Sequence, residues 1–436
     1  MARKSFAEQR NALSLDNILG EHHQAFHKIP DPRNRIIHQS MADICQAGFA
    51  LFHLKFPSLL DFDTMTPFQK ANLKTVYGIK QKCSDTQMRR MLDEVDPEVF
   101  RQRICEVIRN DFSRVGGISQ YQVFDRRLIL SLDGVEHFRS SKVHCSSCLI
   151  HKAANGDISY RHQMLCGSIV HPNESTVFLA AAEPIVRQDG SQKNDCERNA
   201  ASRLIDNLSA DYKAFKFLVV ADSLYGCGPI VEQLLEADHQ FVISVKPGDH
   251  KTLFQHFRAR KAQHKARELV IDEKGKTHRF TWVNNMGLNN TQAHLRVNFL
   301  HYQETNDQGK IVTFSWITNR KINRSNVNLL MRIGRSRWKI ENETFNTLKN
   351  QGYNFEHNYG HGKKHLCTGL AYLMLLAFLT DQLMELCSST FQEILCKART
   401  RVKVWFSQRA LFTTQHHQSY LSIYGKLVEL YGVQQV

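Results

Sequence analysis

The residue pattern changes near Arg127, and this change limits the chain to a fold that combines helices with a sheet. Before this point apolar residues recur at helical spacing, as in the stretch 37–54. After it come three runs of strand-forming residues, 127–138, 163–170 and 174–181. Because the three runs lie so close in sequence, we expect them to form an antiparallel meander.

Helices and strands then alternate along the chain. We expect a helix over 199–208, a buried strand over 216–221 and a short strand over 241–245. Between the last two, Pro229 suits the first position of a helix, where its missing N–H costs no hydrogen bond. Three hairpin strands followed by this alternation predict a mixed α/β sheet with helices on its faces.

Changes in the residue pattern divide the rest of the chain into regions. Between residues 246 and 320 a basic helix precedes several alternating segments separated by turn signals, which predicts an all-β insertion. The helical N-terminal region is a candidate for DNA binding, and a purely structural packing role is the alternative. We expect a helical N-terminal region (1–125), the first part of an α/β domain (126–245) and the β-rich insertion (246–320). The second part of the α/β domain (321–385) and a helical C-terminal region (386–436) follow.

The chain carries an excess of basic residues. Of 436 residues, 57 are Lys or Arg and 42 are Asp or Glu, a formal net charge of +15 that attracts polyanions. A membrane is not expected as partner, because the longest apolar run, 366–379, is shorter than the ~20 residues needed to span one. We interpret that run as a core helix. No secretory segment is visible, and scattered single cysteines suit reduced thiols, so a cytoplasmic location is expected.

Two aspartates follow directly after apolar strands. Asp133 closes the run 128–132, and Asp222 closes the run 217–221. Taken alone, each is better explained by a structural role, a turn at Asp133-Gly134 and a cap before the next helix at Asp222. As a pair in one sheet they would repel each other unless protonated or bridged by cations, and Mg²⁺ prefers carboxylate oxygens. The pair therefore predicts a metal site.

A third carboxylate comes from the segment 335–349, whose spacing predicts an amphipathic helix. The predicted apolar face consists of Trp338, Phe345 and Leu348. Glu341 lies on this face, and an acid there is costly unless it has a partner. Glu343 lies about 200° away and is expected to be solvated. We therefore prefer Glu341 as a metal ligand and keep Glu343 as the alternative.

The ordered blocks around these acids resemble bacterial insertion-sequence transposases of the DDE type. The resemblance covers about residues 125–380 and is carried by the blocks 131–134, 220–225, 337–349 and 352–362. It implies a ribonuclease-H-like α/β fold, a mixed sheet flanked by helices, with an all-β insertion before the final glutamate and helical N- and C-terminal regions. It also implies that Asp133, Asp222 and Glu341 are the catalytic carboxylates.

The block around the glutamate departs from the family pattern of tyrosine, arginine, glutamate and lysine. Arg337 and Glu341 fit this pattern. Gly334 stands where the tyrosine is expected, and the lysine falls one place late, at Lys349. The resemblance implies that Arg337 and Lys349 contact DNA phosphate near the cleavage point, and an ordinary basic helix face is the alternative.

Other contacts with DNA are expected as well. The resemblance implies that Trp316 stacks on a flipped-out base, which is worth about 1–3 kcal/mol, or else is a core residue of the insertion. Tyr225 is a further expected DNA contact. Basic residues crowd the segments 251–267 and 320–339, as phosphate contacts require.

The resemblance implies cut-and-paste transposition by two-metal phosphoryl transfer. Asp133 would bridge two Mg²⁺ or Mn²⁺ ions, while Asp222 and Glu341 would each hold one. The expected partners are double-stranded DNA, both the terminal inverted repeats and the target, and a second copy of the chain in a homodimer. Two alternatives are a nuclease of the same fold without strand transfer and an inactive, transposase-derived DNA-binding protein.

One cysteine pair has the spacing of a zinc site. Cys145 and Cys148 are separated by two residues and flanked by histidines. A second cysteine pair is absent, although His162 or Cys166 would complete a site. An ordinary loop with two thiols is the preferred interpretation, and zinc is the alternative.

Overall fold

A single mixed sheet forms the centre of the molecule. The computed structural model describes residues 13–34, 39–187, 194–292 and 294–433. Within these ranges the strand order is β3-β4-β2-β6-β7-β11-β10-β9-β8, with β5 paired to β4 and β1 to β2. The strands are β1 (Gln122–Val123), β2 (Arg127–Ser140), β3 (Leu149–Lys152), β4 (Ile158–Val170), β5 (Phe178–Ile185), β6 (Phe217–Ala221), β7 (Gln240–Ser244), β8 (Arg267–Glu273), β9 (Lys276–Gly287), β10 (Arg296–Thr305) and β11 (Ile311–Thr318).

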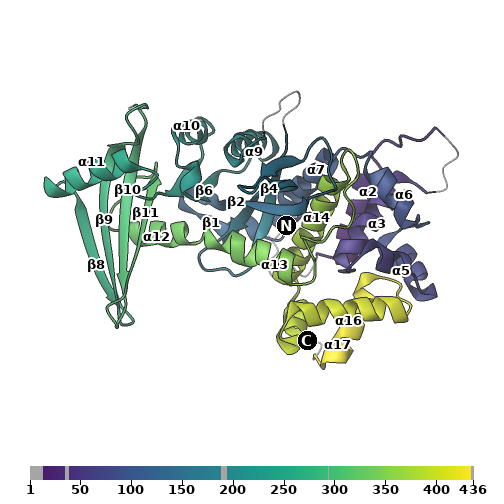
Figure 1. Cartoon of the computed structure of the whole chain (residues 1–436). Helices are drawn as coiled ribbons and strands as arrows, with labels where there is room; N and C mark the ends of the chain where they lie inside the picture. Colours follow the sequence, from purple (N-terminus) through teal and green to yellow (C-terminus); the bar gives the residue numbers. More distant parts are fainter. Residues whose placement is uncertain (1–12, 35–38, 188–193, 293, 434–436) are drawn as a thin grey trace.

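The first half of the sheet has the expected α/β organisation. Strands β2, β4 and β5 pair antiparallel, whereas β6 lies parallel to both β2 and β7. Helix α9 (Glu197–Asp211) connects β5 to β6, and α10 (Gly228–Glu236) connects β6 to β7. Figure 1 shows α9 and α10 on one side of these strands and α12 (Val327–Arg335) and α13 (Asn346–Asn350) on the other. This is the mixed sheet flanked by helices that the sequence predicts.

The β-rich insertion continues this sheet instead of forming a separate one. Strand β11 pairs antiparallel with β7 through Trp316–Ser244, Ile317–Ile243 and Thr318–Val242. Its last four residues are buried, while its first three, on the outer part of the strand, are exposed. Helix α11 (Lys251–Ala262) covers the insertion, with the rings of Phe257 and Phe299 4.5 Å apart (Figure 1).

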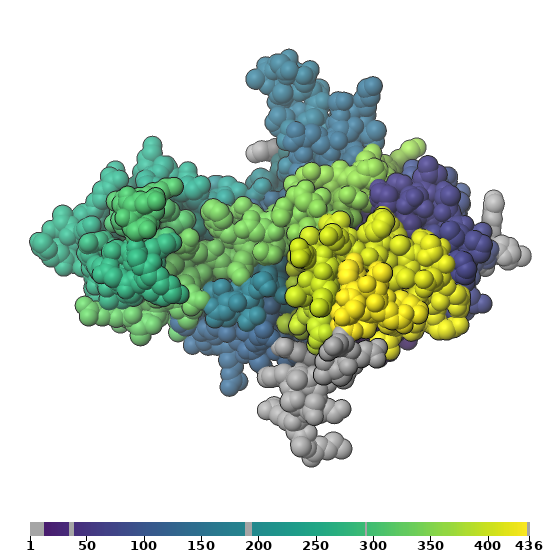
Figure 2. Space-filling model, turned by 90° about the horizontal axis from the view of Figure 1, so that it is seen from below, coloured from purple at the N-terminus to yellow at the C-terminus, as the bar shows by residue number. Residues whose placement is uncertain are grey.

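The two ends of the chain pack into one helical body. Helix α3 contacts α14, α5 contacts α16, and α2 contacts α17. Asn72 donates a hydrogen bond of 2.7 Å to the carbonyl of Phe412, and Figure 2 shows the first and last parts of the chain side by side. The described helices here are α2 (Leu15–Phe26), α3 (Met41–His53), α4 (Leu59–Asp63), α5 (Pro67–Tyr77), α6 (Asp85–Leu92), α7 (Glu98–Val107), α8 (Gly117–Tyr121), α14 (Leu366–Cys387), α15 (Ser389–Ala398), α16 (Arg401–Thr414) and α17 (Tyr420–Tyr431).

Helix α14 is the core of this body, as its apolar sequence predicts. By length and composition alone it is the one described helix that qualifies to cross a membrane, yet 94% of its most apolar window is buried inside the protein. Asp381, in the second half of this helix, is also buried. A buried acid with a protein partner identifies α14 as an internal helix of a folded core.

The partner of Asp381 is a buried lysine from the N-terminal helices. The Lys55 ammonium forms an ion pair with Asp381 and donates to the carbonyl of His53 at 2.8 Å. The Tyr353 hydroxyl donates to the same carboxylate at 2.5 Å, and the Lys55 nitrogen lies 4.0 Å from the centre of the Trp405 ring. Burial favours the neutral acid, but the neighbouring Lys55 charge holds the pKa of Asp381 below its usual value.

Candidate active site

Strands β2 and β6 bring the two predicted aspartates together. Their parallel pairing runs as far as Ser131 opposite Val220. Asp222 directly follows the last residue of β6, and a continuation of this register by two residues would bring it opposite Asp133; the charge of Asp222 does act on Asp133. Because side chains alternate across a strand, Ser131 and Asp133 project from the same face of β2.

The third carboxylate reaches this point from a helical segment above that face. Residues Ile340–Phe345 form a π-helix, η4, which contacts β2 and β4. The Ser131 hydroxyl donates to the carbonyl of Arg337 at 3.0 Å, and the hydroxyls of Ser168 and Thr344 share a hydrogen bond of 2.9 Å. These two contacts fix the chain against β2 just before η4, at Arg337, and against β4 within η4, at Thr344.

Arg337 links two of the carboxylates directly. Its guanidinium lies 3.3 Å from Oδ2 of Asp133 and 2.7 Å from Oε1 of Glu341. One cation therefore pairs with two acids that are distant in sequence, one in the middle of β2 and one in η4. This shared cation holds the side chains of Asp133 and Glu341 at one point of the structure.

Asp133 lies in an environment that opposes its ionisation. Burial, together with the nearby charges of Glu341 and Asp222, raises its pKa to about 7, although the Arg337 guanidinium and the N–H of Gly134 act in the opposite direction. Acids that repel each other are relieved by a bound divalent cation, and three carboxylates are a donor set that Mg²⁺ prefers. The residues present therefore fit a divalent metal.

This raised pKa predicts a pH-dependent stability. The pKa of an aspartate in the unfolded chain is about 3.9. Between a pH of about 4 and a pH of about 7 the folded protein therefore keeps a proton on Asp133 that the unfolded chain has lost, so the metal-free fold loses stability as the pH rises through this range. Replacing Asp133 by asparagine removes this penalty. We expect thermal denaturation in EDTA to show a larger gain in Tm for Asp133→Asn over wild type at pH 8 than at pH 5. Equal gains at both pH values would contradict this.

Asp222 caps a short helix with one oxygen. Its Oδ1 accepts the N–H of Leu224 at 2.8 Å, at the start of the 3-10 helix η3 (Ser223–Tyr225). The alternative of a capping role is therefore real, but it uses only this oxygen. Among the described residues Oδ2 has no hydrogen-bond partner, so it is free to bind a ligand.

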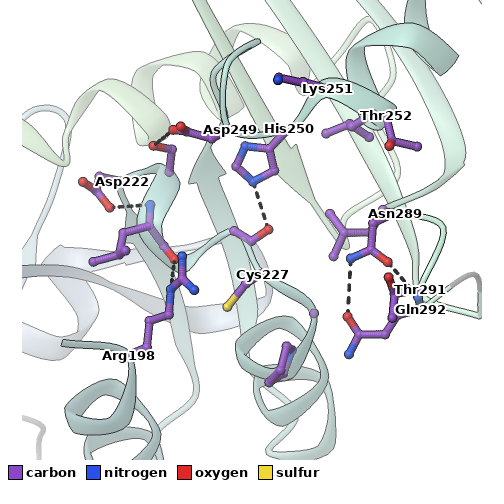
Figure 3. A pocket seen from close by; sticks show the side chains of 17 residues that line it. Arg198, Asp222, Cys227, Asp249, His250, Lys251, Thr252, Asn289, Thr291 and Gln292 are labelled. Atoms are coloured by element: carbon purple, nitrogen blue, oxygen red, sulfur yellow. Dashed lines mark hydrogen bonds between the residues drawn. The ribbon is translucent and has the colours of Figure 1, made fainter. Parts of the chain in front are cut away.

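A polar cleft opens beside Asp222. It has a volume of about 640 Å³ and lies between the starts of α10 and α11 and the loop 288–292 of the insertion. In Figure 3, Asp222 and Arg198 border one side, and Asn289 and Gln292 border the other. His250 is fixed by a contact of 3.0 Å between its Nε2 and the carbonyl of Gly226. The cleft thus extends from Asp222 to the insertion.

Tyr225, an expected DNA contact, is buried in this structure. Only 1% of its surface is exposed, and its hydroxyl donates to Oε2 of Glu197 at 3.0 Å. Burial and the Glu197 charge raise the pKa of Tyr225 well above its usual value. The tyrosine therefore orients Glu197, and its ring is not presented to DNA.

Glu197 is an acid near the site that was not predicted from the sequence. A Cβ atom added at Gly134 would lie 2.6 Å from Oε1 of Glu197, so this carboxylate lies against the residue that follows Asp133. It is the first residue of α9. No sequence signal sets it apart from an acid that simply suits the first turn of a helix.

Trp316 has the core position that the sequence left open as an alternative. It is 2% exposed, and its ring stacks on Phe314 with 5.7 Å between centroids. A Cβ atom at Gly334 would lie 2.5 Å from Nε1 of Trp316. Glycine in place of the family's tyrosine therefore gives the tryptophan ring its space.

The prediction that Glu341 lies on a buried helix face is wrong. The side chain of Glu341 is 47% exposed, Trp338 is 56% exposed, and the buried residues of the segment include Ile340 and Thr344. The helix breaks at Ser336 and continues as a π-helix, whose wider turn shifts the buried face from the positions expected at 3.6 residues per turn. Contact through Arg337, not burial, associates Glu341 with Asp133.

The remaining predicted residues lie elsewhere. Glu343 interacts with the charge of Lys339, away from the Arg337 link. Lys349, in α13, pairs with Glu356 at 2.6 Å. Cys145 and Cys148 contact His162 of β4, whose partner on β2 is Phe138, five residues beyond Asp133, so the cysteines are not part of the carboxylate site.

A comparison with known protein families gives a match to part of the chain. A family model described as a transposase DDE domain matches residues 151–379, which is more than half of the chain. The match includes Asp222 and Glu341 and begins after Asp133, so the placement of Asp133 rests on the sheet register and on its contact with Arg337. The search of curated proteins found no match.

Proposed function

We propose, because this chain belongs to the transposase DDE domain family, that it is a cut-and-paste DNA transposase acting at Asp133, Asp222 and Glu341. The observation that supports the site most strongly is the pairing of Arg337 with both Asp133 and Glu341. Asp133 lies on β2, the strand next to β6, which Asp222 follows. Carboxylates brought together from two strands and a helix have no structural need to converge. Their convergence suits a catalytic centre.

The three acids would hold two Mg²⁺ or Mn²⁺ ions, with Asp133 shared between them. Bound there, such ions supply activation of the attacking oxygen and charge stabilisation of the leaving 3′-oxygen. The chain itself holds the three acids in place. Strands β2 and β6 are fixed by their register, and η4 is fixed to β2 and β4 by the hydrogen bonds of Ser131 and Ser168. Phosphoryl transfer depends mainly on such positioning and on charge stabilisation.

Arg337 is proposed to have a second role. In the metal-free structure its guanidinium pairs with two carboxylates. Neutralisation of these acids by metal would free the guanidinium to bind a DNA phosphate next to the cleaved bond, a planar, bidentate contact that arginine makes well. Lys349 is proposed as a further phosphate contact once its ion pair with Glu356 opens.

Helix α11 supports the proposal that the insertion binds the DNA backbone. Its exposed basic side chains and those just after it have no ion pair with any described residue: Lys251, Arg258, Arg260, Lys261, Lys265 and Arg267. Unpaired cations on one helix suit phosphate contacts that fix DNA without reading its sequence.

We expect the double variant Arg258→Glu/Lys261→Glu to bind DNA at least about tenfold more weakly than wild type. Removing one cation that neutralises a phosphate makes the plot of log affinity against log salt concentration shallower by about 0.9. Fluorescence anisotropy over a salt series measures both quantities. Lys397→Glu, an exposed lysine of α15, is the matched control and should retain affinity and slope. Unchanged binding by the double variant would remove α11 from the proposed interface.

The test of the proposed function is joining, not only cutting. Wild-type protein, DNA carrying the element's own ends, target DNA and Mg²⁺ should yield covalently joined products, formed by a homodimer that pairs two ends. Cleavage without any joined product would instead indicate a nuclease of the same fold. Binding of the ends without cleavage in Mg²⁺ or Mn²⁺ would indicate an inactive DNA-binding descendant.

A further inference from the structure

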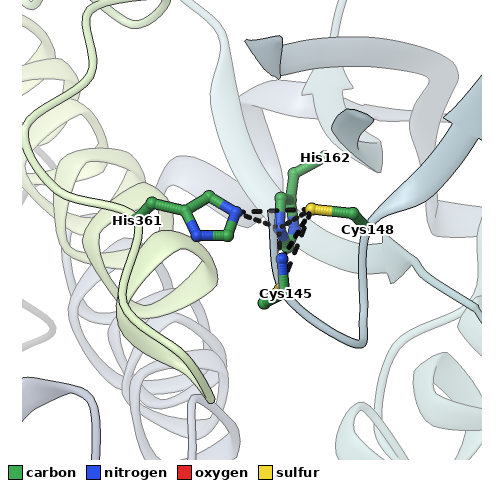
Figure 4. Close-up of side chains that lie close together, drawn as sticks. All are labelled: Cys145, Cys148, His162 and His361. Carbon is green, nitrogen blue, oxygen red and sulfur yellow. Dashed lines mark hydrogen bonds between the residues drawn. The ribbon is translucent and has the colours of Figure 1, made fainter. Parts of the chain in front are cut away.

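Four side chains outside the carboxylate site converge on one point. Cys145 and Cys148 come from the loop between β2 and β3, His162 from β4, and His361 from the segment before α14. Their ligand atoms all lie within 4.8 Å of one another, and Figure 4 shows the His361 ring directed at the other three side chains from the opposite side of the cluster to Cys148. The sequence spacing of Cys145 and Cys148 suggested half of such a cluster; the histidines complete it.

The distances within this cluster have the proportions of a tetrahedron. The two sulfur atoms are 3.8 Å apart, and the Nε2 atoms of His162 and His361 are 3.3 Å apart. The Sγ atom of Cys148 lies 3.2 Å from His162 Nε2 and 3.3 Å from His361 Nε2, and Cys145 Sγ lies 3.4 Å from His162 Nε2.

A zinc ion requires nearly the same distances. Bonds of about 2.3 Å to sulfur and about 2.05 Å to nitrogen, in tetrahedral directions, separate two sulfurs by about 3.8 Å, two nitrogens by about 3.3 Å and a sulfur from a nitrogen by about 3.5 Å. We propose that Cys145, Cys148, His162 and His361 bind one structural zinc ion. This proposal does not depend on the proposed function.

The surroundings indicate a closed, structural site. Cys148, His162 and His361 are buried, and four protein ligands leave no position for a substrate. The Nδ1 atom of His361 lies 2.9 Å from the carbonyl of Gly362, a contact in which Nδ1–H donates and Nε2 is left to bind metal. The backbone N–H of Cys145 donates to the Cys148 sulfur at 3.4 Å, which fixes the loop around this sulfur.

The proposed zinc would join two parts of the chain that are distant in sequence. His361 belongs to the loop that leads from α13 to α14, whereas the other ligands belong to the sheet and its first connecting loop. The same loop is held from the other side by Asp93, whose carboxylate accepts the N–H groups of residues 363 to 366 at 2.9–3.0 Å. Zinc would therefore attach the loop that follows the Glu341 segment to β4.

Elemental analysis of the full-length chain, purified without a metal-affinity column, tests this site. We expect about one zinc per chain in wild type and almost none in Cys148→Ser or His361→Ala. Cys196→Ser, an exposed cysteine outside the cluster, is the matched control and should retain zinc. Asp222→Ala should retain it too, which separates this site from the carboxylates.

A second measurement uses wild-type protein, so it does not depend on the folding of a variant. Exchange of the bound metal for Co²⁺ should produce the visible absorption of tetrahedral cobalt with thiolate charge-transfer bands. The proposal is overturned if wild type carries no zinc and gives no such spectrum, or if mass spectrometry of the native chain finds Cys145 and Cys148 joined as a disulfide.

Discussion

Glu341→Gln is expected to slow DNA cleavage on the order of 10³-fold, equivalent to about 4 kcal/mol less transition-state stabilisation. The amide keeps the size of the side chain and removes the charge that would help to hold a metal ion. It also leaves Arg337, which lies 2.7 Å from a carboxylate oxygen of Glu341 in the wild type, with only Asp133 as a charged partner. Single-turnover rates on DNA carrying the element's ends measure the effect.

Glu343→Gln is the control for this variant. Glu343 lies two residues away, and its charge acts on Lys339 instead of on the Asp133 site. Its rate should stay within about threefold of wild type, a difference of less than about 0.7 kcal/mol. The opposite ranking of the two variants would move the third carboxylate to Glu343 and would make the Arg337 link a structural contact only.

Lys55→Met is expected to cause the largest loss of stability. Removing one partner of a buried ion pair leaves an uncompensated charge, here on Asp381, and costs about 3–5 kcal/mol of the free energy of unfolding. The Tyr353 hydroxyl still donates to Asp381 at 2.5 Å, and Nε2 of His53 lies 3.4 Å from the other carboxylate oxygen. Burial lowers the pKa of His53, so neither group supplies the positive charge that the lysine carried. Denaturant unfolding followed by circular dichroism measures the change.

An exposed pair provides the comparison for Lys55. Lys426 and Glu429 lie 2.8 Å apart on α17 with exposed side chains, so Lys426→Met should change stability by less than about 1 kcal/mol. The double variant Lys55→Met/Asp381→Leu should recover part of the loss, because it removes the unpaired charge as well. If Lys55→Met were as mild as Lys426→Met, the buried pair would not hold the two ends of the chain together.

The mixed sheet could be predicted from the sequence because its strands are marked locally. The apolar runs before Asp133 and Asp222 belong to β2 and β6, as strands buried on both faces require. The prediction that Asp133 closes its strand is wrong, because β2 continues to Ser140. Pairing at long range could not be predicted. The union of β11 with β7, which makes the insertion part of the same sheet, depends on packing at the end of β11 and has no local sign.

In the site, too, features marked by the local sequence could be predicted, whereas those that depend on tertiary contacts could not. Asp133 and Asp222 could be proposed because each follows a local apolar run, whereas the burial of Tyr225 and its hydrogen bond to Glu197 depend on how η3 and α9 meet. The predicted burial of Glu341 was wrong because it assumed 3.6 residues per turn through a π-helical segment. Spacing could not identify His361, because it lies 199 residues from His162.

The most direct measurement of the central claim is Mg²⁺-dependent cleavage of a donor DNA that carries the element's own ends. It compares wild type with Asp133→Ala, Asp222→Ala and Glu341→Ala, each first shown to bind the ends as wild type does. The carboxylate site predicts that wild type cuts at the ends and that all three variants bind without cutting. Cleavage by Asp133→Ala or Asp222→Ala at the wild-type rate would contradict the assignment of the active site.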